Sequence, residues 1–191
     1  MPRLFVAIEL PETVRDLLEP LALGLPGGRA VPREQLHLTL RFIGELEGKA
    51  LRDVRGVLGE VRARPFSLTA CGVGCFPRRR DPRVAWAGFR HGPELAALHR
   101  GVEAALERVG IPPEGRKLHP HVTLVRLGAP RPARVAAWLR EHAMLESPPF
   151  PVTAFRLYSS LLRPSGAVHR VEERYALLGD DEPAGTDETD A

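Results

Sequence analysis

The stretch LHLTLRF, residues 36–42, returns as PHVTLVR, residues 120–126, an offset of 84 positions from His37 to His121. Both copies alternate apolar and polar side chains, which is the period of a half-buried β-strand. Each strand therefore presents one imidazole beside one hydroxyl: His37 with Thr39, and His121 with Thr123. Strands of this kind, present twice, predict a duplicated fold with two facing motifs.

Strict alternation also predicts which side chains share a face. In the first copy it places Arg41 on the face of His37 and turns the leucines and Phe42 into the core. In the second copy it turns Arg126 away from His121, unless the strand bends or ends there.

The sequence around each copy repeats as well. Apolar residues at helical spacing precede and follow both motifs, and a pair of strand-like runs closes each repeat. The expected helices carry Val14–Leu21, Leu51–Val61, Leu95–Leu106 and Val135–Leu139; the expected strand pairs are Phe66–Val73 with Val84–Phe89 and Phe150–Leu161 with Val168–Leu178. Pro20 is expected to kink or end the first helix. This order predicts an α+β fold of two lobes related by a pseudo-twofold axis. Two mainly antiparallel sheets would flank a central cleft, with helices outside.

Composition sets the class of protein. A chain of 191 residues fits one domain of two intertwined lobes over residues 1–179, followed by an acidic, disordered tail, residues 180–191. The formal charge is +3 overall; because the tail holds six acidic and no basic side chains, residues 1–179 carry +9. A basic body favours polyanionic partners, although a GC-rich genome would also enrich arginine. No stretch has the features of a membrane span or a secretory signal, so we expect a cytoplasmic protein, with a monomer as the default.

Two imidazoles that converge on one point suit in-line displacement at phosphorus. One histidine can take a proton from water while the other gives a proton to the departing sugar oxygen. The hydroxyls of Thr39 and Thr123 can donate to the non-bridging oxygens, where charge develops. This chemistry needs no metal and no cofactor. A single His-x-Thr is more often structural, but two copies in repeated surroundings favour function.

The remaining histidines and the cysteines are expected to be structural. His91, His99, His142 and His169 are predicted to be surface or packing residues, and Cys71 and Cys75 to be free thiols. His119 forms His-x-His with His121, a spacing found in zinc sites. Because neither motif has a nearby carboxylate or cysteine partner, we do not expect zinc.

The two motifs resemble those of the two-histidine (2H) phosphoesterases, and within them bacterial and archaeal RNA 2′,3′-cyclic phosphodiesterases, also called 2′-5′ RNA ligases. The segments RLFVAI (3–8), RVAW (83–86) and SLLRPSG (160–166) are similar too. The resemblance implies hydrolysis of a terminal 2′,3′-cyclic phosphate to a 2′-phosphomonoester. It implies that His37 is the proton donor and His121 the proton acceptor. It also implies that Thr39 and Thr123 hold the phosphate, with Arg126 as a further ligand.

Other contacts follow less directly. Arg41 is a second candidate phosphate ligand, from its predicted face. Phe5, Phe42 and Trp86 could stack on a base or belong to the core. Three consecutive arginines in the first hairpin loop could hold RNA phosphates or form a solvated turn; they are Arg78, Arg79 and Arg80. After the Pro-x-Gly turn, Val168 and His169 stand where the family often has an aromatic residue.

Three alternative functions remain open. The same site could join RNA ends through a 2′-5′ bond without ATP, by reversal of the cleavage step. It could cleave 2′-5′ oligonucleotides. The chain could also be an RNA-binding module without activity, although binding alone does not need two imidazoles.

Overall fold

The computed structural model describes residues 2–77, 81–128, 131–163 and 166–178. Two features expected from the sequence lie outside these described residues: the acidic tail, and the three arginines of the first hairpin loop, Arg78, Arg79 and Arg80. The predicted RNA contact of these arginines is therefore neither confirmed nor contradicted by the structure, and both features remain predictions.

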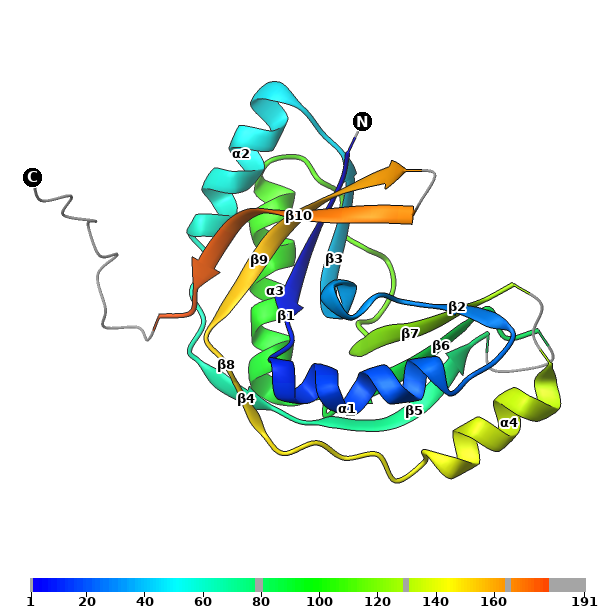
Figure 1. Cartoon of the computed structure of the whole chain (residues 1–191). Coiled ribbons are helices and arrows are strands. Elements are labelled where there is room, and N and C mark those ends of the chain that lie inside the picture. The colour runs from blue at the N-terminus through cyan, green and yellow to red at the C-terminus, as the bar shows by residue number, and fades with distance from the viewer. Residues whose placement is uncertain (1, 78–80, 129–130, 164–165, 179–191) are drawn as a thin grey trace, which may run out of the picture.

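Two four-stranded sheets, each antiparallel throughout, form the framework (Figure 1). Sheet A has the order β10 (Gly166–Ala176), β9 (Ala154–Arg163), β1 (Arg3–Glu9) and β3 (His37–Glu45). Sheet B has the order β2 (Gly28–Ala30), β7 (His121–Leu127), β6 (Val84–Phe89) and β5 (Ala70–Phe76). The two motifs thus begin β3 and β7, and these strands contact each other. The predicted α+β class is confirmed.

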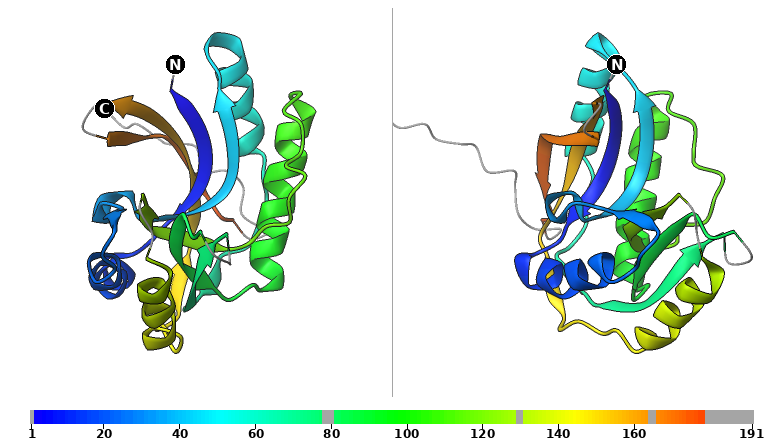
Figure 2. Two further views of the ribbon diagram at one scale, coloured as in Figure 1. Left: turned by 90° about the vertical axis from the view of Figure 1, so that its right-hand side faces the viewer. Right: turned by 45° about the vertical axis from the view of Figure 1, so that its right-hand side comes forward.

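Within the described part of the chain, four α-helices cover the sheets. α2 (Gly48–Gly59) and α3 (Pro93–Arg108) lie side by side against sheet A, as Figures 1 and 2 show. α1 (Glu12–Leu23) packs on β7, and the indole of Trp138 in α4 (Pro132–Glu141) donates a hydrogen bond to the Leu21 carbonyl. Pro20 was expected to kink or end α1, and it does not end the helix, which runs on to Leu23. The helix continues because Ala22 is buried and the amide of Gly24 closes the last turn on the Pro20 carbonyl.

The repeats exchange strands. Sheet A joins β3 of the first repeat to the hairpin β9–β10 of the second, and sheet B joins β7 of the second repeat to the hairpin β5–β6 of the first. β1 lies between β9 and β3 in sheet A, as β6 lies between β5 and β7 in sheet B. Because β1 takes the place in sheet A that β6 has in sheet B, β10 lies at the edge of sheet A. Each four-stranded sheet is therefore built from strands of both repeats.

A short strand pair lies between the repeats. Each long strand expected from Phe66 and Phe150 is broken at a threonine, giving β4 (Phe66–Leu68) and β8 (Phe150–Val152) ahead of β5 and β9. β4 pairs antiparallel with β8. Their sequences, FSLTA from 66 and FPVTA from 150, repeat with the same offset of 84 positions as the histidine motifs. Antiparallel pairing of equivalent segments is what a pseudo-twofold axis between them requires.

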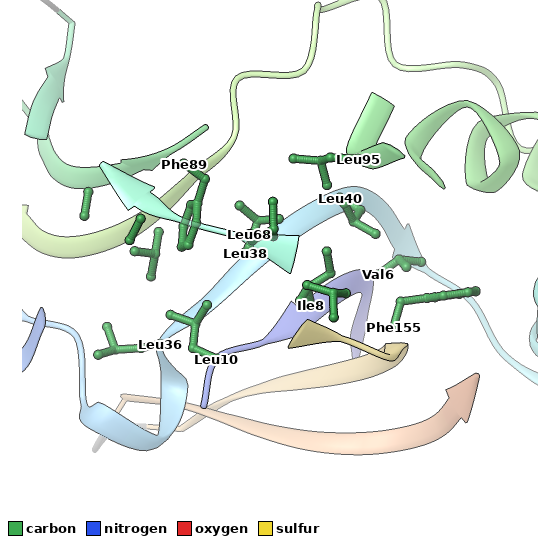
Figure 3. Packing of buried hydrophobic residues seen from close by; sticks show 14 of the residues in the cluster. Val6, Ile8, Leu10, Leu36, Leu38, Leu40, Leu68, Phe89, Leu95 and Phe155 are labelled. Atoms are coloured by element: carbon green, nitrogen blue, oxygen red, sulfur yellow. The ribbon is translucent and has the colours of Figure 1, made fainter. Parts of the chain in front are cut away.

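The core anchors the first motif strand. Leu36, Leu38 and Leu40 are each at most 2% exposed and belong to one apolar core with Ile8 of β1 and Leu95 of α3 (Figure 3). Full burial of a leucine contributes about 1.5–3 kcal/mol relative to exposure. The leucines thus fix β3 from behind and hold its opposite face toward β7.

Candidate active site

A β-bulge follows the threonine in both motif strands. In β3, Thr39 pairs with Ala7 and Arg41 with Val6, so Leu40 is an extra residue without a partner of its own. In β7, Thr123 pairs with Trp86 and Val125 with Ala85, which makes Leu124 extra. A bulge resets the alternation of side chains beyond it. The next two residues of each strand therefore lie on faces opposite to those that strict alternation predicts.

The bulges decide which side chains join the histidines. Phe42 is 61% exposed, and its ring lies 6.0 Å from that of Phe5, which stacks on His37. Arg126 is exposed on the face of His121, as its position beyond the bulge requires. The predicted core position of Phe42 was wrong. The second motif strand does bend, and this bend returns Arg126 to the side of the histidines.

Arg41 is turned away from the site. It is 7% exposed and forms ion pairs of 2.7 Å with Glu103 in α3 and 3.3 Å with Glu114. It also donates to the carbonyl of Pro112, in the segment that leads to the second motif. The prediction that Arg41 lies on the catalytic face was wrong, because the bulge at Leu40 redirects it toward α3.

The two imidazoles are held in the same way. Nδ1 of His37 lies 2.7 Å from the carbonyl oxygen of Gln35, and Nδ1 of His121 lies 2.7 Å from that of His119. A carbonyl can only accept, so each Nδ1 carries a proton and donates it. The other nitrogen, Nε2, is then the one available to give or take a proton. The Gln35 side chain in turn donates to the Ala167 carbonyl of β10, which ties the orientation of His37 to the β9–β10 hairpin.

His37 lies in an aromatic pocket that includes a third imidazole. Its ring is 4.8 Å from Phe5, 6.0 Å from Tyr158 and 5.3 Å from His169. Burial lowers the pKa of His37 to about 4, with further contributions from the positive charge on His169 and on Arg126. His169 is a site residue that the sequence analysis assigned to packing or the surface. Its place after the Pro-x-Gly turn, where the family often has an aromatic residue, was the signal that could have identified it.

His121 has a similar aromatic neighbourhood. Its ring lies 5.2 Å from Phe76, 6.0 Å from Trp86 and 5.9 Å from His119. Burial lowers the pKa of His121. Phe5 and Trp86 are 3% and 8% exposed, so both pack against the histidines and belong to the walls of the site. Of the three aromatic residues considered from sequence, Phe42 is the one open to a ligand.

The groups expected to hold phosphate are unengaged within the described part of the chain. Neither Thr39 nor Thr123 uses its hydroxyl in a hydrogen bond there, and no carboxylate pairs with Arg126 among these residues. The charge of Arg126 also lowers the pKa of both His37 and His169. A guanidinium on the strand face of His121 and Thr123, with no carboxylate partner among the described residues, suits an anion.

Metal ligands do not gather at the described residues. No group of three or more histidine, cysteine, aspartate or glutamate side chains there could hold a metal ion, and His119 and His121 are not joined by a third ligand of this kind. Within the same residues, no helix is long and apolar enough to cross a membrane.

A family model described as LigT-like phosphoesterase matches the chain twice, over residues 7–86 and again over 90–169. The chain belongs to the LigT-like phosphoesterase family. The two matches follow the two repeats, each with its own His-x-Thr strand. This places the chain among the 2H phosphoesterases, as the resemblance in the sequence suggested.

Relatives of known name extend over nearly the whole chain. An RNA 2′,3′-cyclic phosphodiesterase of Thermus thermophilus is 39% identical over 191 residues, covering 93% of this chain and 91% of the relative. One from Escherichia coli is 31% identical, covering 92% and 96%. A crystal structure from T. thermophilus superposes with a TM-score of 0.80 at 32% identity, covering 93% of this chain and 99% of that one. E. coli LigT complexed with 3′-AMP gives 0.75 at 30% identity, covering 94% and 100%.

Proposed function

We propose that this LigT-like phosphoesterase hydrolyses 2′,3′-cyclic phosphates at RNA ends to 2′-phosphomonoesters. The observation that carries the proposal is the pair of bulged strands. Each presents an imidazole oriented through Nδ1, a free threonine hydroxyl and, beyond the bulge, a side chain returned to the same face. The similar proteins named RNA 2′,3′-cyclic phosphodiesterase supply the substrate class.

The reaction needs one proton to leave and one to arrive. His121 accepts the proton of a water molecule through Nε2 as the water oxygen attacks phosphorus. The bond from phosphorus to the 3′ oxygen breaks, and His37 gives its Nε2 proton to that oxygen. The 2′ oxygen keeps the phosphate. Each proton transfer contributes roughly 10²- to 10⁴-fold to the rate.

His37 can act as the acid only if it holds a proton when substrate is bound. In the free protein its low pKa, about 4, keeps it mostly neutral at neutral pH. A phosphate anion beside the ring favours the charged form and offsets the positive charge of Arg126. Binding of the substrate phosphate therefore raises the pKa of His37, and the catalytic proton is taken up together with the substrate.

The remaining groups hold the substrate. Thr39 and Thr123 donate from opposite strands to the non-bridging oxygens, and Arg126 adds a charge-assisted hydrogen bond to the same group. The exposed ring of Phe42 provides a face on which the terminal base stacks. RNA phosphates farther from the reacting group are proposed to contact the arginines of the first hairpin loop, Arg78, Arg79 and Arg80.

Hydrolysis of 2′,3′-cyclic AMP by the purified protein, in the presence of EDTA, tests the proposal. Liquid chromatography separates the two possible monoesters. We expect 2′-AMP, formed at a rate that EDTA does not change. Formation of 3′-AMP, or turnover that requires added metal, would contradict the proposed mechanism.

A further inference from the structure

Sheet B carries its permanent charge at one place. Across its four strands, β2, β5, β6 and β7, all of them within the described residues, two arginines are present and no aspartate, glutamate or lysine. The two are Arg29 of β2 and Arg126 of β7, and they are direct partners in the antiparallel register. Sheet A differs, because glutamates lie on β1, β3 and β10. The positive charge of sheet B is therefore concentrated in one cross-strand pair.

The backbone directs Arg29 to the catalytic face. A Cβ atom on the preceding Gly28 would lie 2.5 Å from Cγ1 of Val125 and 3.0 Å from Cδ2 of Leu127. Both of these side chains are buried, so Gly28 faces the core and has no room for a side chain. Arg29 is the next residue along the strand and points to the opposite face, as does its partner Arg126; both residues are exposed.

A short segment joins this arginine pair to the first catalytic histidine. After β2, the amide of Val31 donates to the carbonyl of Leu124 at the bulge of β7. The 3-10 turn Arg33–Gln35 follows and leads directly into His37. The charge of Arg126 lowers the pKa of His37. The pair therefore lies near the histidine that gives its proton to the 3′ oxygen.

Two guanidinium groups in direct cross-strand register repel each other. This repulsion is offset when each group faces an anion. In the proposed reaction Arg126 holds the cyclic phosphate, which matches one of the two charges. Arg29 lies one strand away on the same face, with the Cα atoms of such paired residues about 4.5–5.5 Å apart. Successive phosphates of an RNA strand are separated by a single ribose, a spacing that two long side chains on neighbouring strands can match.

An RNA end with a 2′,3′-cyclic phosphate offers one such neighbouring group. Because the 2′ and 3′ oxygens are both joined to the cyclic phosphate, the strand continues only through the 5′ oxygen of the same nucleoside. We propose that Arg29 binds the phosphodiester on this 5′ oxygen while Arg126 holds the reacting phosphate. The site then recognises two adjacent phosphates, which selects RNA ends over cyclic mononucleotides that have a free 5′ hydroxyl. This inference rests on the proposed function.

Three substrates that differ only at the 5′ oxygen test the subsite. They are 2′,3′-cyclic AMP, its 5′-(methyl phosphate), which carries the single negative charge of a phosphodiester, and its 5′-(dimethyl phosphate), which has nearly the same shape and no charge there. The value of kcat/KM for hydrolysis is measured for each. We expect the wild-type enzyme to favour the methyl phosphate over both others by about fivefold to tenfold, from one charge-assisted contact at an exposed site. The preference should shrink as the salt concentration rises.

Variants of Arg29 locate the contact. Arg29→Gln should remove most of the preference for the methyl phosphate, and Arg29→Lys, which keeps the charge, should retain part of it. Arg52→Gln is the matched control, because Arg52 is an exposed arginine of α2, and it should leave the preference unchanged. Arg126→Gln should lower kcat/KM for all three substrates. Each ratio of kcat/KM values is taken on one protein sample, so it does not depend on the fraction of that sample that is folded.

The outcomes separate the two proposals. Equal kcat/KM for the methyl and dimethyl phosphates, or a preference that Arg29→Gln retains, would overturn the subsite while leaving hydrolysis established. A loss in Arg29→Gln that is the same for all three substrates would also overturn it, because Arg29 would then act on the reacting phosphate. A wild-type enzyme that hydrolyses none of the three would overturn the proposed function, and the subsite with it.

Discussion

Replacement of Arg41 by methionine separates a structural role from a phosphate-binding role. Methionine keeps much of the apolar stem of arginine and removes the charge. Arg41 and Glu103 have side-chain exposures of 8% and 14%, so the change leaves a largely buried carboxylate without its partner. Breaking a buried ion pair in this way costs about 3–5 kcal/mol.

The structure favours the lower end of that range. Glu103 keeps a contact of 3.8 Å with His99 and accepts a hydrogen bond from the Glu114 amide. A loss of about 3 kcal/mol lowers the Tm of a chain of this size by roughly 6–12 °C. The loss in free energy of unfolding comes mainly from the Glu103 carboxylate, which is left without its cationic partner. The double variant with Glu103→Gln should therefore recover at least half of that loss.

Urea and thermal unfolding followed by circular dichroism measure the stability of the single and double variants, and hydrolysis of 2′,3′-cyclic AMP measures their function. We expect KM to change by less than about threefold, since uniform loss of a phosphate contact would raise it far more. An Arg41→Met protein of unchanged stability whose KM rises tenfold would refute the reasoning. That result would indicate that Arg41 binds the substrate phosphate, as strict alternation predicts.

Three further predictions concern the charges of the site. The reaction needs one imidazole neutral and one protonated, and the pKa of both His37 and His121 is lowered from 6.5. We therefore expect kcat/KM to be greatest below pH 6.5 and to fall as pH rises above that value. A maximum above pH 7.5 would contradict this. His169→Phe removes a positive charge that lowers the pKa of His37, so the acidic limb of the kcat/KM profile should move to higher pH; an unmoved limb would exclude the coupling. Arg126→Gln should lower kcat/KM roughly 10- to 100-fold, with Arg126→Lys retaining part of the activity; equal losses would point to a role of shape rather than charge.

The repeat made most of the fold predictable from the sequence. The helices and the two motif strands follow from periodicity, and the offset between His37 and His121 indicates the pseudo-twofold relation. The same offset in FSLTA and FPVTA marks the β4–β8 pair. The exchange of hairpins between sheets could not be predicted, because both sheets offer equivalent edges and only tertiary packing selects one.

The bulges explain the errors at the site. A bulge moves every later side chain to the other face, and in the first motif the polar Arg41 conceals it, because a polar residue after Leu40 continues the alternation. In the second motif the adjacent apolar residues Leu124 and Val125 interrupt the alternation and reveal it. His169 and Arg29 acquire their importance from strand register across long distances in sequence, which local patterns do not specify.

The most direct test of the central claim compares two substrates in two variants. One substrate is 2′,3′-cyclic AMP, and the other has sulfur in place of the bridging 3′ oxygen, a leaving atom that needs no proton. If His37 is the acid, His37→Asn should lose activity on the oxygen substrate and regain most of it on the sulfur substrate. His121→Asn, which lacks the base, should remain inactive on both. Equal recovery in both variants, or recovery in His121→Asn alone, would contradict the assigned roles.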